Sequence, residues 1–474
     1  MTMTAPPVSS PTAETYLFDI ETDGLLDTVS VLHVACVVRL EDKQRWVFDK
    51  ALYDDPLREF QKFLIEAASR GAHAGGHNVI GYDIPALAKL GVGWPFEHAR
   101  TFDTIVLARL LWPDLKGSDL DLWKRGTLPG QLIKSHSLEA WGHRLGVLKG
   151  DYGKKEAAWD TWTPEMTSYC QQDVLVTCAL YDHVMKHEPD PRSVKLEHDV
   201  AWIISRQERH GVVFDVAAAQ TLYGTIRELE QAEAERLRGT FPLRCLPKGK
   251  ETSPKKNNMP RGVSVGCPYQ NVVFREYNPR SQADTIYWFM KRYGWVPEEK
   301  TDKGRPKLDD DVLRTLDFPE AKQLAFHAML AKRLGQLGDG DGAWLKKYDA
   351  ATGRMYGRVV TNGCVTGRMS HFSPNMAQVP KVKKNKQGEV LKGPEGLFGF
   401  ECRSLFAAPQ GRLLVGCDAS GLELRCLAHY LAKYDGGRYG KELIEGDIHT
   451  HNMKAAGLSS RDQAKTFIYG YLAH

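Results

Sequence analysis

The sequence lacks the paired cysteines that cross-link secreted domains or hold a structural zinc ion. Its nine cysteines are odd in number and scattered over 474 residues, and no two of them have a C-x-x-C spacing. This usage excludes a disulfide framework and a zinc knuckle. It favours a reducing, intracellular setting.

Long apolar runs are also missing. No stretch of about 18 apolar residues occurs, so we expect no membrane-spanning helix and no membrane partner. Residues 1–14 are mostly Pro, Ser, Thr and Ala, without the basic and apolar regions of a secretion signal, and we interpret them as a disordered tail. The net charge of +4 is too small by itself to indicate nucleic-acid binding, although local basic clusters remain.

What is present is the composition of a globular protein of two or three domains, with 42% hydrophobic and 26% charged residues. The first 185 residues alternate between strand and helix patterns, which predicts an α/β domain. Two prolines in 186–194 predict a linker, and we place a domain boundary there. The elements expected before the linker are strands 15–20 and 31–40, helix 56–70, an apolar turn at 84–90, and helices 103–112 and 163–184.

The second half has a mainly helical pattern with two basic interruptions. Helices are expected over 195–240, 280–294 and 319–337. Residues 244–270 lose periodicity and carry six basic residues among Pro, Gly and Asn, which predicts a flexible loop. A second basic, Gly-rich loop is expected over 381–392. No internal repeat is found.

A strand that ends in acid is the first unusual feature, "TYLFDIETDGLL" at residues 15–26. Asp19 and Glu21 point to the same side of this strand, whereas Ile20 points into the core. No basic residue lies nearby in the sequence, and adjacent like charges are unfavourable unless something positive lies between them. We therefore expect a divalent cation between the two carboxylates.

Two further segments carry acids at informative spacings. "GHNVIGYDIPAL" places Asn78 and Asp83 around a turn before a helix, and "SYCQQDVLVTCAL" places Tyr169 and Asp173 four apart, hence on one helix face. Together with the strand pair, four carboxylates from three segments can hold two Mg²⁺ ions, roughly 3.5–4 Å apart. Tyr169 would orient the attacking water or help to deprotonate it.

Taken singly these patterns are weak, because an acid pair after a strand is commonly a turn or a helix cap. Jointly and in this order, they resemble the D-x-E, N-x3-[FY]-D and Y-x3-D motifs of the DnaQ-like 3′-to-5′ exonucleases, in the tyrosine variant. The resemblance covers residues 15–185 and implies an RNase H-like exonuclease domain in which the four acids are metal ligands. Asp103 has a simpler interpretation, since it precedes a predicted helix and can serve as its N-cap.

Three segments of the second half combine polar side chains with regular patterns. "TNGCVTGRMSHFSPNMAQVPK" (361–381) is irregular, and its long polar side chains can reach groove edges and phosphates. In "GRLLVGCDASGLELRCLAHYLAKY" (411–434), an apolar strand at 413–417 is expected to deliver Asp418, and a helix follows. "RDQAKTFIYGYL" (461–472) is a helix whose basic and aromatic face, about 12 Å long, suits a triphosphate and a base. Alone, this helix is explained equally well by a solvated basic face.

As a set, these segments resemble the family A DNA polymerases, or bacterial polymerase I family, and most closely the replicative polymerases of podovirus-type bacteriophages. "DASGLELR" matches motif A, "RDQAKTFIYG" matches motif B, "TGRMSHFSPNMAQVP" matches the primer-template segment, and "GDIHTHNMKAAGL" matches the D-I-H-T element. The resemblance implies a mainly helical right-hand polymerase domain over 195–474, with a thumb and parts of the palm and fingers.

The same resemblance assigns roles residue by residue. Asp418 would be a catalytic metal ligand, and Glu423 would disfavour a ribose 2′-OH. The implied reaction is attack of a primer 3′-OH on the α-phosphorus of a dNTP, with Mg²⁺, on primer-template DNA; single-stranded DNA would be the exonuclease substrate, all in the cytoplasm of a bacterial host cell. The other residues implied to bind are His449, Arg461 and Lys465 at the triphosphate, Tyr469 at the base and sugar, and Arg368, Asn375 and Gln378 at the duplex.

The resemblance breaks at His474, where the chain stops inside the motif B helix. The later H-D-E turn, which supplies the family's second palm carboxylate, is missing. Because one carboxylate cannot hold two metals in the required geometry, we expect only the exonuclease to work alone. The polymerase site would hold two Mg²⁺ ions only when completed by a C-terminal part. A split gene with a separately encoded C-terminal half and a truncation both explain this end.

Partners and rival functions follow from the same segments. Some phage relatives recruit thioredoxin through a long thumb insertion, but the corresponding stretch here, 242–272, is short and basic, which argues against thioredoxin and favours phosphate contacts with duplex DNA. One alternative is a stand-alone 3′-to-5′ exonuclease whose second half only grips DNA. The other is a non-enzymatic DNA-binding accessory protein. Unbroken acidic motifs argue against the accessory protein, and Asp418, Glu423, Arg461 and Lys465 favour polymerase ancestry.

Overall fold

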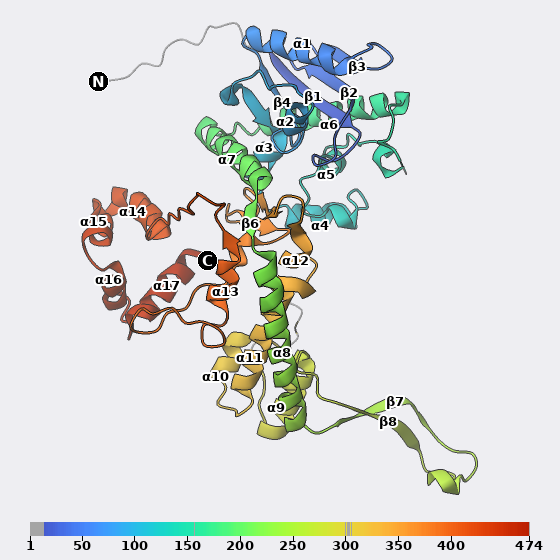
Figure 1. The fold of residues 1–474 in the computed structure, drawn as a ribbon, viewed down its shortest axis with the longest axis vertical. Coiled ribbons are helices and arrows are strands. Elements are labelled where there is room, and N and C mark those ends of the chain that lie inside the picture. Colours follow the sequence, from blue (N-terminus) through green and yellow to red (C-terminus); the bar gives the residue numbers. More distant parts are fainter. Residues whose placement is uncertain (1–13, 156, 299, 301–303, 305, 474) are drawn as a thin grey trace. The chain divides into compact units, whose positions relative to one another are not determined.

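The computed structural model of the protein describes residues 14–155, 157–298, 300, 304 and 306–473 (Figure 1). Its contacts divide the chain into two compact units, Met1–Ala407 and Ala408–His474, and each is described by itself. In the described part of the chain, no helix is both long and apolar enough to cross a membrane.

The predicted tail, residues 1–14, lies outside the described residues except for its last member. Glu14 is part of the folded domain, because its carboxylate pairs with Arg39 at 2.8 Å and with Arg70 at 3.0 Å. Its carbonyl oxygen also accepts a hydrogen bond from the backbone N–H of His73 at 2.8 Å. The tail prediction is therefore wrong for Glu14.

A five-stranded sheet with the order β3-β2-β1-β4-β5 forms the centre of the N-terminal part. Strand β1 pairs antiparallel with β2 and parallel with β4. The strands are β1 (Thr15–Thr22), β2 (Leu32–Arg39), β3 (Arg45–Asp49), β4 (His73–Gly76) and β5 (Thr101–Asp103). The helices around them are α1 (Pro56–Ser69), α2 (Asp83–Lys89), α3 (Thr104–Leu111), α4 (Lys116–Lys124), α5 (Leu138–Leu145) and α6 (Pro164–Met185).

Both faces of β1 are covered by helices. Tyr16 and Phe18 pack into one hydrophobic cluster with residues of α1 and α2. Leu17 points to the opposite face and packs with residues of β2 and α6. Because Asp19 and Glu21 follow Leu17 at intervals of two, they share the face that α6 covers (Figure 1).

Most of the predicted elements of this region are confirmed, namely the two strands and the helices at 56–70, 103–112 and 163–184. The residues predicted as an apolar turn, 84–90, instead form most of helix α2, which confirms the helix predicted after the turn that holds Asn78 and Asp83. The sequence pattern did not predict β3, β4, β5, α4 or α5. Strand β4 reads His-Ala-Gly-Gly, and a Cβ at Gly75 would collide with the carbonyl oxygen of Phe102 on β5. Glycine is therefore required at position 75 because β4 and β5 approach closely, although glycine has a low strand propensity.

Helix α7 (Pro191–His210) begins inside the predicted linker 186–194. Asp190 caps it and Pro191 occupies its first position, so residues 191–194 are helical and that part of the linker prediction is wrong. The helix packs on the N-terminal sheet domain: Trp202 stacks on His98 with ring centroids 4.2 Å apart. The division into domains 15–185 and 195–474 stays a prediction.

Beyond α7, a short strand interrupts the predicted helix 195–240. β6 (Val212–Phe214) precedes the long helix α8 (Val216–Thr240) and belongs to a sheet of order β13-β6-β10-β9. Phe214, Leu330 and Trp344 lie in the hydrophobic cluster that joins this sheet to the helices. The remaining elements are α9 (Gln282–Tyr293), α10 (Asp310–Thr315), α11 (Ala321–Leu334), α12 (Trp344–Lys347), α13 (Gly399–Ser404), β9 (Tyr348–Asp349), β10 (Arg354–Met355), β11 (Arg358–Val360), β12 (Ser370–Phe372) and β13 (Phe406–Ala407).

The predicted helices at 280–294 and 319–337 are confirmed by α9 and α11, and α11 continues as a π-helical turn over Gly335–Asp339. The predicted loop 381–392 is confirmed as a loop with one isolated bridge between Lys384 and Val390.

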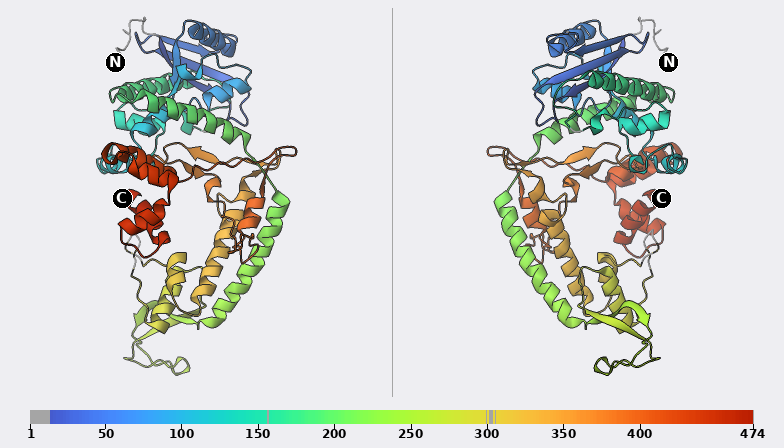
Figure 2. Two further views of the ribbon diagram at one scale, coloured as in Figure 1. Left: turned by 90° about the vertical axis from the view of Figure 1, so that its left-hand side faces the viewer. Right: turned by 90° about the vertical axis from the view of Figure 1, so that its right-hand side faces the viewer.

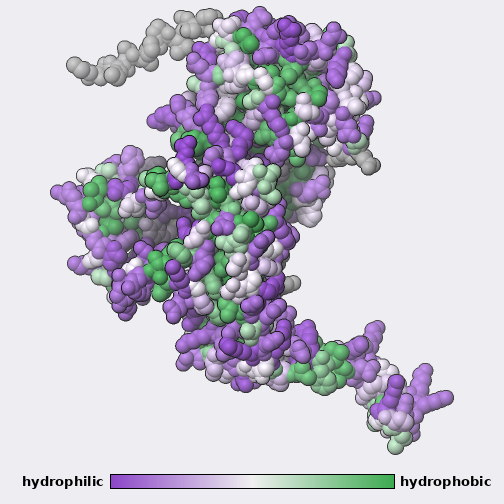
Figure 3. Space-filling model, viewed as in Figure 1, coloured by the Kyte–Doolittle hydropathy of each residue, from purple (hydrophilic) through white to green (hydrophobic). Residues whose placement is uncertain are grey.

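The predicted flexible loop 244–270 is wrong in its outer parts, because β7 (Arg244–Thr252) and β8 (Tyr269–Arg275) pair into an antiparallel hairpin (Figure 2). Both faces of the hairpin are largely exposed, so the alternation that marks a half-buried strand is missing from the sequence. Its exposed apolar surface, which includes Val272 and Phe274, is visible in Figure 3.

The described residues of the second unit form the helices α14 (Leu422–Asp435), α15 (Arg438–Glu445), α16 (Ile448–Ala455) and α17 (Arg461–Ala473), after an irregular segment. The predicted helices after Asp418 and over 461–472 are confirmed. The predicted strand 413–417 is wrong: these residues have no regular structure, and the side chain of Val415 is 91% exposed. No described strand pairs with them, and an apolar run does not form a stable strand alone.

Candidate active site

Four carboxylates come from three elements of the N-terminal domain. Asp19 and Glu21 lie on β1, Asp83 is the first residue of α2, and Asp173 lies in the middle of α6. Asp83 and Asp173 are buried, whereas Asp19 and Glu21 are half-buried. Ile20, between the two strand acids, lies in the opposite core as expected.

The four carboxylates interact electrostatically, because the charges of Asp83 and Asp173 act on both Asp19 and Glu21. Burial raises the pKa of Asp19 well above its usual value, and the charges of Asp83 and Asp173 raise it further. Burial, Asp19 and Asp173 act in the same way on the pKa of Glu21. Burial raises the pKa of Asp83 to about 7 and that of Asp173 to about 6. Without a cation, such a cluster opposes its own ionisation.

Two buried oxygens of the cluster have no hydrogen-bond partner among the described residues, Asp83 Oδ1 and Asp173 Oδ1. A buried carboxylate oxygen without a donor is unfavourable, unless an ion or water completes it. Magnesium prefers carboxylate oxygens as ligands. The donor set of Asp19, Glu21, Asp83 and Asp173 therefore fits Mg²⁺.

Cys170 is a neighbour that the sequence analysis missed. Ligand atoms of Asp19, Glu21 and Cys170 lie within 4.8 Å of one another. Burial raises the pKa of the Cys170 thiol, so the group is neutral, and its Sγ donates to the Asp19 carbonyl oxygen at 3.4 Å. The cysteine therefore orients β1 instead of adding a thiolate to the cluster.

Asp103 holds the turn that presents Asp83. As predicted, its side chain caps α3 by accepting from the backbone N–H of Ile105 at 3.0 Å. It also accepts from the N–H groups of Asn78 at 2.7 Å and Ile80 at 3.1 Å, so the turn is fixed from within the domain. Asn78 has a φ of 67°, which asparagine tolerates better than most residues. The asparagine of the motif is thus explained by backbone conformation.

Tyr82, immediately before Asp83, ties the same turn to β1. Its hydroxyl donates to the carbonyl oxygen of Gly24 at 2.6 Å and lies 2.5 Å from the Thr22 hydroxyl. These contacts fix the entry of α2 beside the end of the strand.

Tyr169 lies one helical turn before Asp173, as predicted, and a lysine from another segment joins the pair. The Lys149 ammonium donates to Asp173 Oδ2 and lies 4.7 Å from the centre of the Tyr169 ring. Although burial lowers the pKa of Lys149, Asp173 raises it beyond its usual value. The sequence analysis found no basic residue near Asp19 and Glu21. This is correct for residues nearby in the sequence, but Lys149 is nearby in the folded domain. No spacing or periodicity marks Lys149.

In the second unit, three of the predicted nucleotide-binding residues lie together. Burial lowers the pKa of His449, and the cations of Arg461 and Lys465 lower it further, so α16 and α17 bring these groups close. Arg461 Nε donates to Asp447 Oδ2 at 2.9 Å. Sequence reasoning included Asp447 in the D-I-H-T element without a role, and the structure shows that it caps α16.

The other predicted polymerase residues are spread over both units. Asp418 is exposed in a segment without regular structure, Glu423 lies in the first turn of α14, and Tyr469 lies on α17. The predicted DNA-contacting residues belong to the first unit, where the Asn375 side chain accepts from the N–H of Ala377 at 3.1 Å. The others are Arg368 in an exposed loop and Gln378, whose carbonyl oxygen accepts from Gln336 at 3.0 Å.

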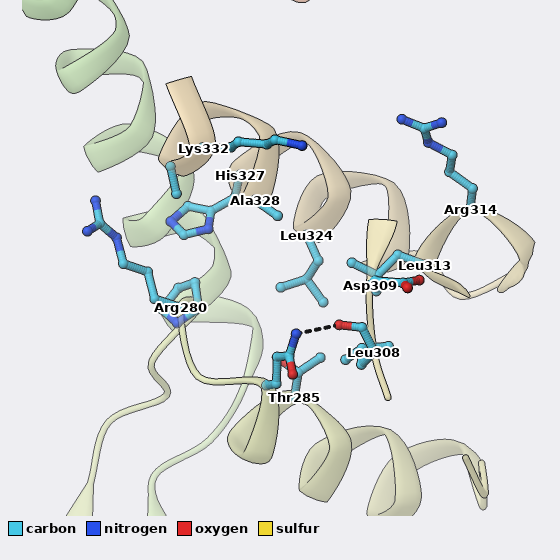
Figure 4. A pocket seen from close by; sticks show the side chains of 13 residues that line it. Arg280, Thr285, Leu308, Asp309, Leu313, Arg314, Leu324, His327, Ala328 and Lys332 are labelled. Atoms are coloured by element: carbon cyan, nitrogen blue, oxygen red, sulfur yellow. Dashed lines mark hydrogen bonds between the residues drawn. The ribbon is translucent and has the colours of Figure 1, made fainter. Parts of the chain in front are cut away.

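A separate pocket of about 650 Å³ lies among α9, α10 and α11 (Figure 4). Its wall includes His327 and Arg280, which both pair with the buried Glu230, at 3.1 and 2.7 Å. Its lining contains none of the predicted site residues.

Comparison with known proteins identifies relatives over nearly the whole chain. The family model of DNA polymerase family A matches residues 268–472. DNA-directed DNA polymerases of Enterobacteria phage T3 and Escherichia phage T7 are each 35% identical, over 96% of this chain and 75% of theirs. DNA polymerase I of Pseudomonas aeruginosa is 31% identical over 78% of this chain and 36% of its own length.

A solved structure shares the fold: the POL domain of Pol1 from M. smegmatis, in complex with DNA primer-template and dNTP, has a TM-score of 0.62. It is 16% identical and covers 97% of this chain and 68% of that chain. The resemblance inferred from the sequence motifs is confirmed by the phage relatives: the chain belongs to DNA polymerase family A.

Proposed function

We propose that the protein is a phage-type DNA-directed DNA polymerase whose N-terminal domain, residues 15–185, removes nucleotides from the 3′ end of a DNA strand. Two observations support the exonuclease part: the charges of Asp83 on α2 and Asp173 on α6 act on Asp19 and Glu21 of β1, and Asp83 and Asp173 each have a buried oxygen that lacks a partner among the described residues. The relatives are named DNA-directed DNA polymerases, which supports the polymerase part.

In the exonuclease site, Asp19, Glu21, Asp83 and Asp173 would hold Mg²⁺. Bound metal stabilises the charge on a scissile phosphodiester and makes a bound water more acidic. Burial and Asp173 raise the pKa of the Tyr169 phenol to about 12, so it is neutral at pH 7. Tyr169 therefore orients the attacking water through a hydrogen bond and does not act as a phenolate base.

In the polymerase site, the proposed roles follow charge and position. Arg461, Lys465 and His449 would bear the charge of the incoming triphosphate; the charges of Arg461 and Lys465 on α17 act on His449 of α16, which supports a shared role. Tyr469, one turn further along α17, would stack on the base. Asp418 would be a Mg²⁺ ligand. The remaining roles are sugar selection by Glu423 and duplex contacts by Arg368, Asn375 and Gln378.

A digestion assay tests the exonuclease. The full chain is incubated with Mg²⁺ and single-stranded DNA labelled at its 5′ end, and the products are resolved by length. We expect stepwise shortening from the 3′ end, and a loss of about a thousandfold or more in the Asp19→Ala, Glu21→Ala double variant. Asp42→Ala is the matched control, because Asp42 is an exposed carboxylate of the same domain, paired with Arg39 at 2.6 Å. Undiminished digestion by the double variant would refute the assignment.

The stand-alone exonuclease is the second candidate, and the exposed position of Asp418 outside regular structure is the observation that favours it. The two functions differ in whether residues 408–474 bind a nucleotide. Binding of a dNTP that weakens in Lys465→Ala would favour the polymerase, and no measurable dNTP binding would favour the exonuclease alone.

A further inference from the structure

The acidic cluster contains a cation of its own, Lys149. Its side chain is 23% exposed, its ammonium donates to Asp173 Oδ2, and its Nζ lies 4.7 Å from the centre of the Tyr169 ring. The second oxygen of the same carboxylate, Asp173 Oδ1, is buried and has no described partner. The Asp173 carboxylate thus has one oxygen bonded to the Lys149 ammonium and a second oxygen available to a metal ion.

The backbone around Lys149 is fixed against α6. The Gln172 side-chain amide donates to the carbonyl oxygen of Leu148 at 2.7 Å. The N–H of Val147 donates to the carbonyl oxygen of Gly142 at 3.0 Å. A Cβ at Gly142 would lie 2.7 Å from the Val147 carbonyl oxygen, so glycine is needed for this close approach. Lys149 is therefore delivered to the site by a constrained segment.

The charge of Lys149 reduces repulsion among the carboxylates before any metal binds. Four carboxylates close together repel one another, and each is disfavoured by burial. A lysine ammonium within this cluster offsets part of that repulsion. A divalent ion bound by the same carboxylates would repel the ammonium, because like charges a few ångströms apart interact strongly where water is scarce.

We propose that Lys149 is the resident counter-ion of the acidic site, which occupies Asp173 in the metal-free chain and is displaced when a divalent ion binds. The proposal rests on the proposed exonuclease function, in which Asp173 is a metal ligand. In this account Lys149 is a positioning residue that acts through Asp173 and Tyr169. A purely structural lysine would behave differently, since its removal would leave metal affinity unchanged or weaken it.

Chemical labelling of the wild-type chain tests displacement directly. The full chain is treated briefly with acetic anhydride, with and without Mg²⁺, and acetylation of each lysine is measured by mass spectrometry. Lys155 is an internal reference, because it is exposed and lies 5.0 Å over the ring of Tyr152, outside the acidic cluster. We expect Mg²⁺ to raise the rate at Lys149 about tenfold relative to Lys155. An unchanged or lower relative rate would overturn the proposal.

Metal affinity gives the second test. Mn²⁺ binding to the full chain is measured by electron paramagnetic resonance for the wild type, Lys149→Met, Lys149→Arg and Lys155→Met. Removing the internal cation should tighten binding in Lys149→Met about tenfold, whereas Lys149→Arg and Lys155→Met should stay within about twofold of the wild type. Equal or weaker binding by Lys149→Met would contradict the proposal.

The Mn²⁺ measurements distinguish a failure of the proposed exonuclease function from a failure of the Lys149 proposal. If the Asp19→Ala, Glu21→Ala variant binds Mn²⁺ like the wild type, the cluster is not the metal site and the exonuclease proposal fails first. If that variant loses binding but Lys149→Met binds no more tightly than the wild type, only the role of Lys149 is wrong. Should Lys149→Met not fold, the labelling of the wild type still decides.

Discussion

The two acidic sites that the sequence motifs single out differ most in their scaffolds. Asp19 lies on β1, a strand whose two faces are both covered, and Asp83 and Asp173 are buried. Asp418 follows an equally apolar run, but that run has no regular structure and Asp418 is exposed. An acid in or after an apolar segment is therefore desolvated only where a sheet and covering helices hold it.

The largest expected effect comes from changing one buried acid without changing its shape. Asp83→Asn should lower the exonuclease rate by about a thousandfold, which corresponds to about 4 kcal/mol of transition-state stabilisation. Asp418→Asn should leave that rate within about twofold, because Asp418 belongs to the other unit. Digestion of single-stranded DNA by the two variants, side by side, measures this. Equal losses of exonuclease rate in the two variants would show that Asp83 and Asp418 do not differ in their contribution to this activity.

A smaller effect is expected on stability, and its sign follows from the raised pKa values. The pKa of Asp83 is raised to about 7 and that of Asp173 to about 6, against unfolded values of about 4. Such groups contribute stability that is complete below the unfolded pKa and is lost as the pH rises through the folded pKa. The buried histidines His77 and His136, whose pKa values are lowered to about 3 and about 4, change stability in the opposite direction. The loss due to the carboxylates is therefore expected as a difference from the Asp83→Asn variant between about pH 4 and pH 7, and Mg²⁺ should remove this difference at pH 8.

Thermal unfolding in EDTA and in Mg²⁺, from pH 5 to pH 8, measures this loss. Each kcal/mol should shift the melting temperature by about 2–4 °C. Asp83→Asn should flatten the metal-free decline, and Asp42→Ala, which changes an exposed carboxylate, should not. An identical pH dependence of the melting temperature in the wild type and in Asp83→Asn, without metal, would show that the cluster is not strained by its own charge.

The smallest effect is expected where charge acts from an exposed surface, at the hairpin of β7 and β8. Changing Lys255 and Lys256 to serine should weaken duplex DNA binding a few-fold and reduce the slope of log K against log salt by about 2. The double change of Lys62 and Lys124 to serine is the control, since both are exposed lysines of the N-terminal domain, paired with nearby acids. An unchanged slope in the hairpin variant would remove the hairpin from the DNA-binding surface.

The parts that sequence reasoning predicted are those with a local pattern. The period of two in β1 places Asp19 and Glu21 on one face, and the four-residue spacing places Tyr169 beside Asp173. Lys149 could not be predicted, because long-range packing alone brings it to the acids. Cys170 lies on α6 three residues before Asp173, but its contact with Asp19 depends on the packing of α6 against β1. For the same reason the pattern did not predict β4, whose Gly75 is required by the approach of β5 and whose Gly76 is required by the approach of β1.

The wrong predictions also have physical causes. The hairpin was predicted as a loop because neither of its faces is buried, and a strand without a buried face shows no alternation. The strand at 413–417 was predicted from apolar residues alone, although a strand also needs a neighbour to pair with. The hydrophobic pattern of a sequence therefore predicts helices and strands well only where one face of the element is buried in the folded protein.

The central claim is that Asp19, Glu21, Asp83 and Asp173 jointly hold divalent metal on a DNA strand. A crystal of the full chain soaked in Mn²⁺ with a short single-stranded oligonucleotide tests it through the anomalous signal of manganese. The account predicts two peaks among these four carboxylates, roughly 3.5–4 Å apart, beside the terminal phosphodiester. Manganese bound elsewhere at saturation, with no peak among these acids, would contradict it.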